Sequence, residues 1–291
     1  MAVAGLPPAL LYAAAAVIGL IVGSFLNVVI LRVPAMLEMR WRQEAADILD
    51  RPEADGGHER FDLVAPGSRC PHCETPIKPW HNLPVIGYLL LGGRCAACRA
   101  RISLQYPAIE IAAALLAIIA IARFGATPWG GCMVGLSWTL LALAAIDFRT
   151  QLLPDSITLP LLWAGLVAST LHLAPAAPTP VAAILGAAAG YGVLWTVFQG
   201  FRIATGKIGM GYGDFKLAAA LGAWLGWAQL PLALLAASLG GALAGGLLIA
   251  SGRMSRDTAM PFGPWLVFGG WLAMVAGDTI GRAYLTLSGL R

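Results

Sequence analysis

Long apolar runs follow one another through most of this sequence, and they constrain its fold more than any other feature. A helix that crosses a bilayer needs roughly 20 apolar residues. Eight segments meet or approach that length, at about 9–32, 106–123, 129–147, 156–173, 181–200, 214–228, 230–250 and 262–285. Only 12% of the 291 residues are charged, whereas a soluble domain carries about 25%. The sequence therefore predicts an all-α polytopic membrane protein with about eight transmembrane helices.

The lysine and arginine residues predict how these helices are oriented. The first apolar run is too long for a signal-peptide core and has no basic residue before it, so we expect a retained helix. If the N-terminus lies outside, 16 of the 19 basic residues fall in cytoplasmic segments, as the positive-inside rule requires. The cytoplasmic segments would include 32–105, 148–155 and 201–213, and Lys216, Arg253 and Arg256 are also counted as cytoplasmic. The net charge of +4 is small and does not indicate nucleic-acid binding.

Charge also divides the chain into three expected parts. Nine of the 15 acidic residues lie between residues 32 and 101. We expect a first transmembrane helix at 1–33, a cytoplasmic domain at 34–105 and a seven-helix membrane domain at 106–291. A short helix is expected around 36–49. The acidic stretch from Asp47 to Asp62 is interpreted as a solvated surface, with steering of a basic peptide as the alternative.

Four of the five cysteines form two pairs in the cytoplasmic domain, Cys70-x2-Cys73 and Cys95-x2-Cys98. Two such pairs, separated by 21 residues, can close a tetrahedral all-cysteine zinc site. A metal would stabilise a loop that has too little apolar content to fold alone. The alternatives are two disulfides or free thiols, and a cytoplasmic location disfavours disulfides.

Two aspartates lie where the predicted topology brings helix ends to the cytoplasmic surface. Asp147 ends an apolar run, and Asp214 follows a glycine-rich stretch, 206–213, and opens the sixth predicted helix. Ionisable residues next to membrane helices are candidates for function. Two neighbouring carboxylates can divide the roles of base and acid in peptide hydrolysis. The alternative is that Asp214 caps its helix and Asp147 is an interfacial anchor.

The remaining acids outside the 32–105 segment have ordinary interpretations. Glu110 follows Pro107 at a helix start, and Asp155 can cap the next helix. Asp257 and Asp278 are interpreted as solvated or capping. The glycines at 209, 211 and 213 do not follow a strand, so they do not indicate a dinucleotide site.

Two other classes of function remain as alternatives to proteolysis. A transporter would use intramembrane aspartates as proton relays, but it would place them near the bilayer midplane. A zinc-binding protein on a membrane anchor would need only one or two helices.

Several short motifs along the chain match those of one known family in both order and spacing. They are Gly23-Ser24-Phe25-Leu26-Asn27-Val28, Cys70-Pro71-x-Cys73, Asn82-Leu83-Pro84, Arg94-Cys95-x2-Cys98, Ile102-Ser103 with Tyr106-Pro107 and Glu110, Asp147 with Leu153-Pro154-Asp155, Gly211-Tyr212-Gly213-Asp214-Phe215-Lys216 and Pro261-Phe262-Gly263-Pro264. Through them almost the whole chain resembles the type IV prepilin peptidases, also called prepilin leader peptidase/N-methyltransferases.

The resemblance implies an aspartyl protease of the bacterial inner membrane. Its substrates would be type IV prepilins and type II secretion pseudopilins, cut at the cytoplasmic membrane face. Asp147 and Asp214 would be the catalytic pair and Cys70, Cys73, Cys95 and Cys98 the zinc ligands. It also implies N-methylation of the new N-terminal residue from S-adenosylmethionine. The residues that bind this cofactor are unknown, and the stretch Gly92-Gly93-Arg94 departs from the family pattern. A protease without methylation is the remaining alternative.

Overall fold

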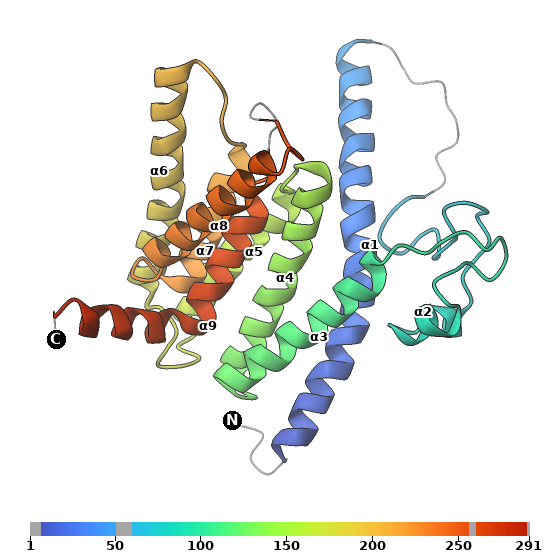
Figure 1. Ribbon diagram of the computed structural model, residues 1–291, viewed down its shortest axis with the longest axis horizontal. Coiled ribbons are helices and arrows are strands. Elements are labelled where there is room, and N and C mark those ends of the chain that lie inside the picture. The colour runs from blue at the N-terminus through green and yellow to red at the C-terminus, as the bar shows by residue number, and fades with distance from the viewer. Residues whose placement is uncertain (1–6, 51–59, 256–259, 290–291) are drawn as a thin grey trace. The chain divides into compact units, whose positions relative to one another are not determined.

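The computed structural model describes residues 7–50, 60–255 and 260–289. Helices account for most of these residues, and no strand occurs among them, only two isolated β-bridges. The helices are α1 (Pro8–Ile48), η1 (Pro79–Asn82), α2 (Ile86–Leu90), α3 (Gln105–Phe124), α4 (Pro128–Thr150), α5 (Asp155–Thr170), α6 (Pro180–Thr205), α7 (Tyr212–Leu225), α8 (Leu230–Ala250) and α9 (Gly263–Leu287) (Figure 1). The predicted all-α fold is confirmed.

Each of the eight expected spans is helical, but their lengths differ more than the apolar runs predict. Among the described residues five helices, α1, α3, α4, α6 and α8, are long and apolar enough to cross a membrane. The helices α5 and α7 have 16 and 14 residues, fewer than the roughly 20 that a straight span needs. Glycines with positive φ follow the last residues of α3, α6 and α7, and the left-handed residue Gly206 terminates the helical hydrogen bonding of α6.

The chain forms two compact units, residues 1–130 and 131–291. In the first unit α1 and α3 run antiparallel and in close contact. A Cβ atom on Gly23 would lie 2.6 Å from the Cα atom of Glu110, and Gly19 lies equally close to Ala114. Small residues permit this approach, which is how helices commonly associate in lipid.

The first helix is longer than its apolar run. The short helix expected around 36–49 exists, but it is continuous with α1, which passes through Pro34 and ends at Ile48. Arg32 lies near the end of the apolar run and holds the following loop. Its guanidinium donates hydrogen bonds to the carbonyl oxygens of Asp62, at 2.7 Å, and Pro66, at 2.6 Å.

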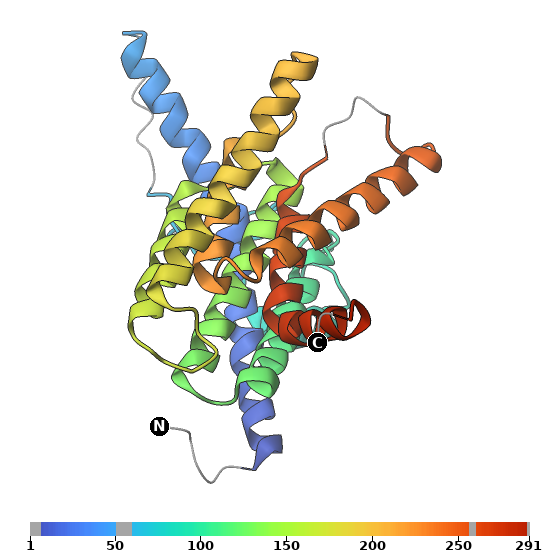
Figure 2. The ribbon, with the colours of Figure 1, turned by 90° about the vertical axis from the view of Figure 1, so that its left-hand side faces the viewer.

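In the second unit α7 is the central helix and packs against α5, α6 and α9. All its side chains from Asp214 to Trp224 are buried except that of Lys216. Close backbone contacts hold it, with Gly222 against Gly186 of α6. The indole nitrogen of Trp224 donates to the Leu161 carbonyl of α5 at 2.8 Å. Figure 2 shows the C-terminal ends of α6 and α8 projecting beyond the rest of this unit on one side.

The end of α4 and the starts of α5, α7 and α9 lie at the same end of the second unit. The start of α5 is tied to the start of α7 by the ion pair of Asp155 with Lys216. The end of α4 is tied to the start of α9 by the hydrogen bond between Asp147 and Gly263. This end of the unit therefore gathers the two aspartates that the sequence singles out.

Candidate functional site

Asp147 lies in the last turn of α4, and its side chain is buried, with 5% of the residue exposed. Its Oδ2 atom accepts a hydrogen bond of 3.0 Å from the backbone nitrogen of Gly263, at the start of α9. A Cβ atom on Gly263 would lie 2.6 Å from that same oxygen. Glycine at 263 therefore gives Asp147 the room to approach the helix terminus.

Asp214 lies in the first turn of α7 and is 7% exposed. Its Oδ2 atom accepts a hydrogen bond of 3.2 Å from the backbone nitrogen of Gly211, the residue that precedes the helix. Asp214 is therefore not the N-cap residue that the sequence offered as an alternative; Gly211 is the N-cap, and Asp214, three residues on, accepts a hydrogen bond from its backbone nitrogen. The next residue, Phe215, is fully buried and contacts the rings of Phe198 and Tyr212, which fixes this turn in the unit.

Asp147 and Asp214 lie at the same end of the second unit, in the last turn of α4 and the first turn of α7. The two residues are 67 positions apart along the chain. The turn between α4 and α5 carries Leu153, whose side chain packs on Gly213, the residue before Asp214. Two buried carboxyl groups at one end of a unit, each accepting a hydrogen bond from a backbone N–H group, can accept and donate protons in one reaction.

The four cysteines of the first unit form a compact cluster whose sulfur atoms all lie within 4.8 Å of one another. The Sγ atoms of Cys70 and Cys98 are 3.8 Å apart, and those of Cys73 and Cys95 are 4.0 Å apart. Tetrahedral zinc with bonds of about 2.3 Å requires about 3.8 Å between sulfurs. This donor set and spacing fit one tetrahedral metal ion.

The two cysteine pairs have the same backbone fold. In each, the first cysteine carbonyl accepts a hydrogen bond from the residue four positions on, Glu74 in one and Arg99 in the other. Both of these residues have positive φ, 55° and 61°. A turn of this kind brings backbone N–H groups toward sulfur, as with Ala97, which donates to the Cys95 Sγ atom at 3.4 Å. Hydrogen bonds with the side chain and the backbone of Thr75 lower the pKa of Cys73 to about 6.

The sequence position of Glu110 suggests an ordinary residue at a helix start, but its contacts in the structure are different. It is buried, and its Oε2 atom accepts a hydrogen bond of 2.7 Å from the backbone nitrogen of Val85. Nearby Asn27 of α1 is also buried, and its side-chain nitrogen donates to the Tyr106 carbonyl at 3.1 Å. The sequence signal for this cluster is that polar residues occur inside two apolar runs.

Gly92 and Gly93 join α2 to the second cysteine pair. Both have positive φ, 57° and 67°, and Gly93 lies against the hydroxyl group of Tyr88. Glycine suits both positions because it adopts positive φ without strain. The structure gives this stretch a turn, and it places no group there that identifies a cofactor site.

The other acidic residues outside the 32–105 segment only partly have the roles expected of them. Asp155 does not cap α5 with its side chain but pairs with Lys216. Asp278 is exposed, and its Oδ1 atom accepts a hydrogen bond of 3.1 Å from Gln229. Asp257 lies outside the described residues.

Comparison with known proteins identifies two family models along the chain. Residues 17–124 match the bacterial Peptidase A24 N-terminal domain, and residues 134–246 match the type IV leader peptidase family. A prepilin leader peptidase/N-methyltransferase of Pseudomonas putida is 49% identical over 97% of this chain and 96% of its own length. Proteins with the same name from Pseudomonas aeruginosa and Aeromonas hydrophila are 46% and 47% identical over 94% and 92% of this chain, and 93% and 91% of their own lengths. No solved structure matches this chain.

Proposed function

The chain belongs to the type IV leader peptidase family, and from that premise we propose that it removes the leader peptides of type IV prepilins and type II secretion pseudopilins. The relatives carry the name prepilin leader peptidase/N-methyltransferase over nearly their full lengths. The observation that carries the chemistry is the pair of buried aspartates, Asp147 and Asp214, at one end of the second unit.

We propose that these two residues form the catalytic dyad. One carboxylate takes a proton from a water molecule, and the oxygen of that water forms a bond to the scissile carbonyl carbon. The other carboxyl group donates its proton to the carbonyl oxygen. When the tetrahedral intermediate collapses, the C–N bond breaks and the leaving nitrogen takes a proton from the dyad. The hydrogen bonds from Gly263 and Gly211 hold each carboxyl group in place.

The proposed site of cleavage is the cytoplasmic face of the inner membrane. Asp147 lies in the last turn of its helix and Asp214 in the first turn of its own, which favours a surface site over a transporter's relay at the bilayer midplane. The excess of basic residues in the connecting segments supports the cytoplasmic orientation. A substrate with a basic leader and an apolar helix would orient by the same rule and present its cleavage site there.

The four-cysteine cluster supports a structural zinc ion, held by Cys70, Cys73, Cys95 and Cys98. Four sulfur ligands leave no open position for a water molecule, so this metal would stabilise the loop. The proposed second activity is N-methylation of the newly exposed N-terminus with S-adenosylmethionine as the methyl donor. The name of the relatives supports it, and we assign no residues to it.

Cleavage of a purified prepilin by the full-length protein in lipid tests the proposal. We expect Asp147→Asn and Asp214→Asn to remove turnover, because each substitution keeps the shape of the side chain but removes its carboxylate. Asp278→Asn, at an exposed aspartate of the same unit, serves as the control. Near wild-type turnover in either dyad variant would refute the dyad. Mass spectrometry of the mature N-terminus tests methylation separately, and an unmodified product would refute that activity alone.

A further inference from the structure

An uncharged segment lies within the most charged part of the chain. Residues 79–93 contain no Asp, Glu, Lys or Arg, and they are bounded by Lys78 and Arg94. Five of their large apolar side chains are 47–72% exposed, and these are Trp80, Leu83, Ile86, Leu89 and Leu90. A domain surrounded by water does not gather apolar side chains in this way without a partner.

The position of this segment along α1 indicates what the partner is. The apolar run of α1 meets its first charged residue at Arg32, nine residues beyond Gly23. At 1.5 Å per residue, Gly23 lies about 13 Å further along the helix toward the membrane interior. Gly23 is packed against Glu110 of α3, and the Glu110 carboxylate binds the backbone of Val85. The start of α2 is therefore held well below the level of Arg32.

The attachment at Val85 is specific. Val85 has φ 59° and ψ −46°, and the nitrogen of Ile86 donates to the Pro84 carbonyl at 2.5 Å, so residues 84–86 form a γ-turn. This turn is strained for a β-branched residue. It directs the Val85 N–H group at the carboxylate of Glu110, at 2.7 Å. The strain is retained because Glu110 fixes the turn onto α3.

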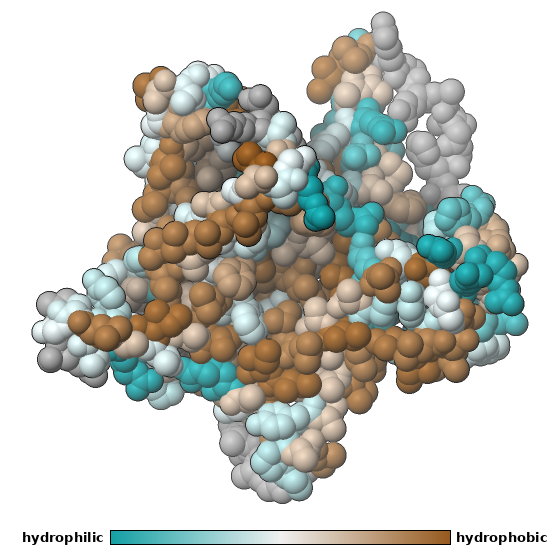
Figure 3. Space-filling view, in the orientation of Figure 1, coloured by the Kyte–Doolittle hydropathy of each residue, from teal (hydrophilic) through white to brown (hydrophobic). Residues whose placement is uncertain are grey.

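We propose that segment 79–93, with α2 at its centre, lies in the cytoplasmic leaflet of the bilayer and that its exposed apolar side chains contact lipid acyl chains. In Figure 3 apolar atoms gather over α2, while hydrophilic atoms cover the loops of the cysteine pairs. The basic residues at both ends reach toward the phosphate groups of the lipids. Lys78 lies 5.5 Å above the ring of Trp80, and tryptophan prefers the membrane interface. This placement does not depend on the proposed reaction.

The inference has a structural consequence for the cysteine cluster. Segment 79–93 connects the first cysteine pair to the second, and Cys95 follows Arg94 directly. An anchored segment therefore holds both pairs at the membrane surface. Without the anchor, the cluster would be tethered only through α1 and α3.

Accessibility measurements on the full-length protein in phosphatidylethanolamine/phosphatidylglycerol vesicles test this inference. A spin-labelled noncanonical amino acid would replace Leu89, and in a second sample Val64, which is also apolar and 79% exposed but lies in the loop held by Arg32. We expect the label at 89 to collide with oxygen more than with an aqueous nickel chelate, and the label at 64 to show the reverse. Equal nickel accessibility at both positions would overturn the proposal.

Two further measurements distinguish lipid from other partners that could cover segment 79–93. Dipolar broadening at position 89 that disappears on dilution with unlabelled protein would identify a second copy of the chain and overturn the proposal. High nickel accessibility at position 89 that falls only when a prepilin is added would identify a substrate surface and would also overturn the proposal. Glu110→Ala should shift position 89 toward nickel accessibility, whereas Glu110→Gln, which keeps an acceptor oxygen, should not.

Discussion

The side-chain amine of Lys216 donates hydrogen bonds to both carboxylate oxygens of Asp155, at 2.7 and 2.6 Å. Lys216 lies two residues after Asp214 in the first turns of α7, and Asp155 begins α5 eight residues after Asp147. The ion pair therefore joins the two chain segments that carry the buried aspartates.

This relationship predicts that the ion pair positions the dyad more than it stabilises the fold. The side chains of Lys216 and Asp155 are 30% and 53% exposed, so solvent screens the pair and its loss should cost less than about 1 kcal/mol of unfolding free energy. A displacement of about 1 Å at a reacting group can lower turnover by up to about 100-fold. We expect Lys216→Met and Asp155→Asn to reduce prepilin cleavage with little change in thermal unfolding.

A double-mutant cycle checks this prediction. The double variant should be no slower than either single variant, because each removes the same contact. Arg202→Gln, at an exposed basic residue of α6, is the control for loss of a positive charge. Additive losses in the double variant would show that the two residues act separately.

The contact of Gly263 with Asp147 predicts that a single methyl group at this position impairs catalysis. A Cβ atom at 263 would lie 2.6 Å from Oδ2 of Asp147 and 3.0 Å from its Cγ atom, so the carboxyl group or α9 must move. We expect Gly263→Ala to lower turnover by about 100-fold or more, since the displaced group is a reacting one. Gly246→Ala on α8 meets open space and should keep wild-type turnover. Wild-type cleavage by Gly263→Ala would argue against a role for this contact.

The geometry of the cysteine cluster predicts one metal ion per chain. Cys73→Ser should lower the zinc content of the purified protein well below one equivalent, because serine is a poor zinc ligand. The loops around the cluster should then become sensitive to proteases, since the metal contributes to their folding. Cys132→Ser removes the fifth cysteine, which is outside the cluster, and should leave the metal bound. Elemental analysis with limited proteolysis measures both effects.

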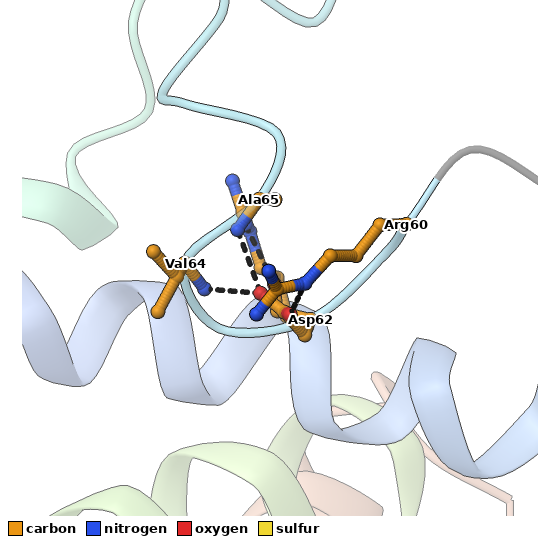
Figure 4. A network of polar contacts seen from close by, with 5 residues as sticks. Arg60, Asp62, Val64 and Ala65 are labelled. Carbon is orange, nitrogen blue, oxygen red and sulfur yellow. Dashed lines mark hydrogen bonds and ion pairs between the residues drawn. The ribbon is translucent and has the colours of Figure 1, made fainter.

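The loop held by Arg32 predicts a pH dependence. Backbone N–H groups of Ala65 and Val64, each 2.7 Å from Oδ1, and the side chain of Arg60 lower the pKa of Asp62 to about 2 from its ordinary value of 3.8 (Figure 4). A lowered pKa means that the ionised carboxylate stabilises the folded loop. This contribution is complete above about pH 4 and is lost as the pH falls through about 2.

Hydrogen exchange of the backbone amides measures this effect. Asp62→Asn should expose the amides of Val64 and Ala65 at neutral pH, and its difference from wild type should shrink as the pH falls from 4 to 2. Glu44→Gln, at an exposed carboxylate of α1, should change neither amide. A difference that stays constant over this pH range would rule out the carboxylate as the cause.

The order of the helices could be predicted from the apolar runs, because hydropathy and length alone decide which segments leave water. Their exact lengths could not. The helices α5 and α7 each end three residues before the expected spans do, because helix ends depend on backbone turns and neighbouring helices. The helix expected around 36–49 is part of α1, since Pro34 is accommodated within the helix.

The candidate residues divide in the same way. Spacing alone singled out Cys70, Cys73, Cys95 and Cys98, because a knuckle is a local structure and two of them are enough for one metal. Asp147 and Asp214 could be named from their places at helix ends. The hydrogen-bond partner of Asp147 could not be predicted, since Gly263 is 116 residues away along the chain.

Glu110 is the clearest case of what local sequence reasoning cannot supply. Its position after Pro107 suggests an ordinary first turn, yet its carboxylate binds the backbone of Val85, 25 residues away. The sequence by itself determined that this chain is a helical membrane protein with a metal-binding cysteine cluster and two aspartates at helix ends. Only the tertiary structure decided which backbone groups the carboxylates of Asp147 and Glu110 meet, because such contacts depend on the packing of segments that are far apart along the chain.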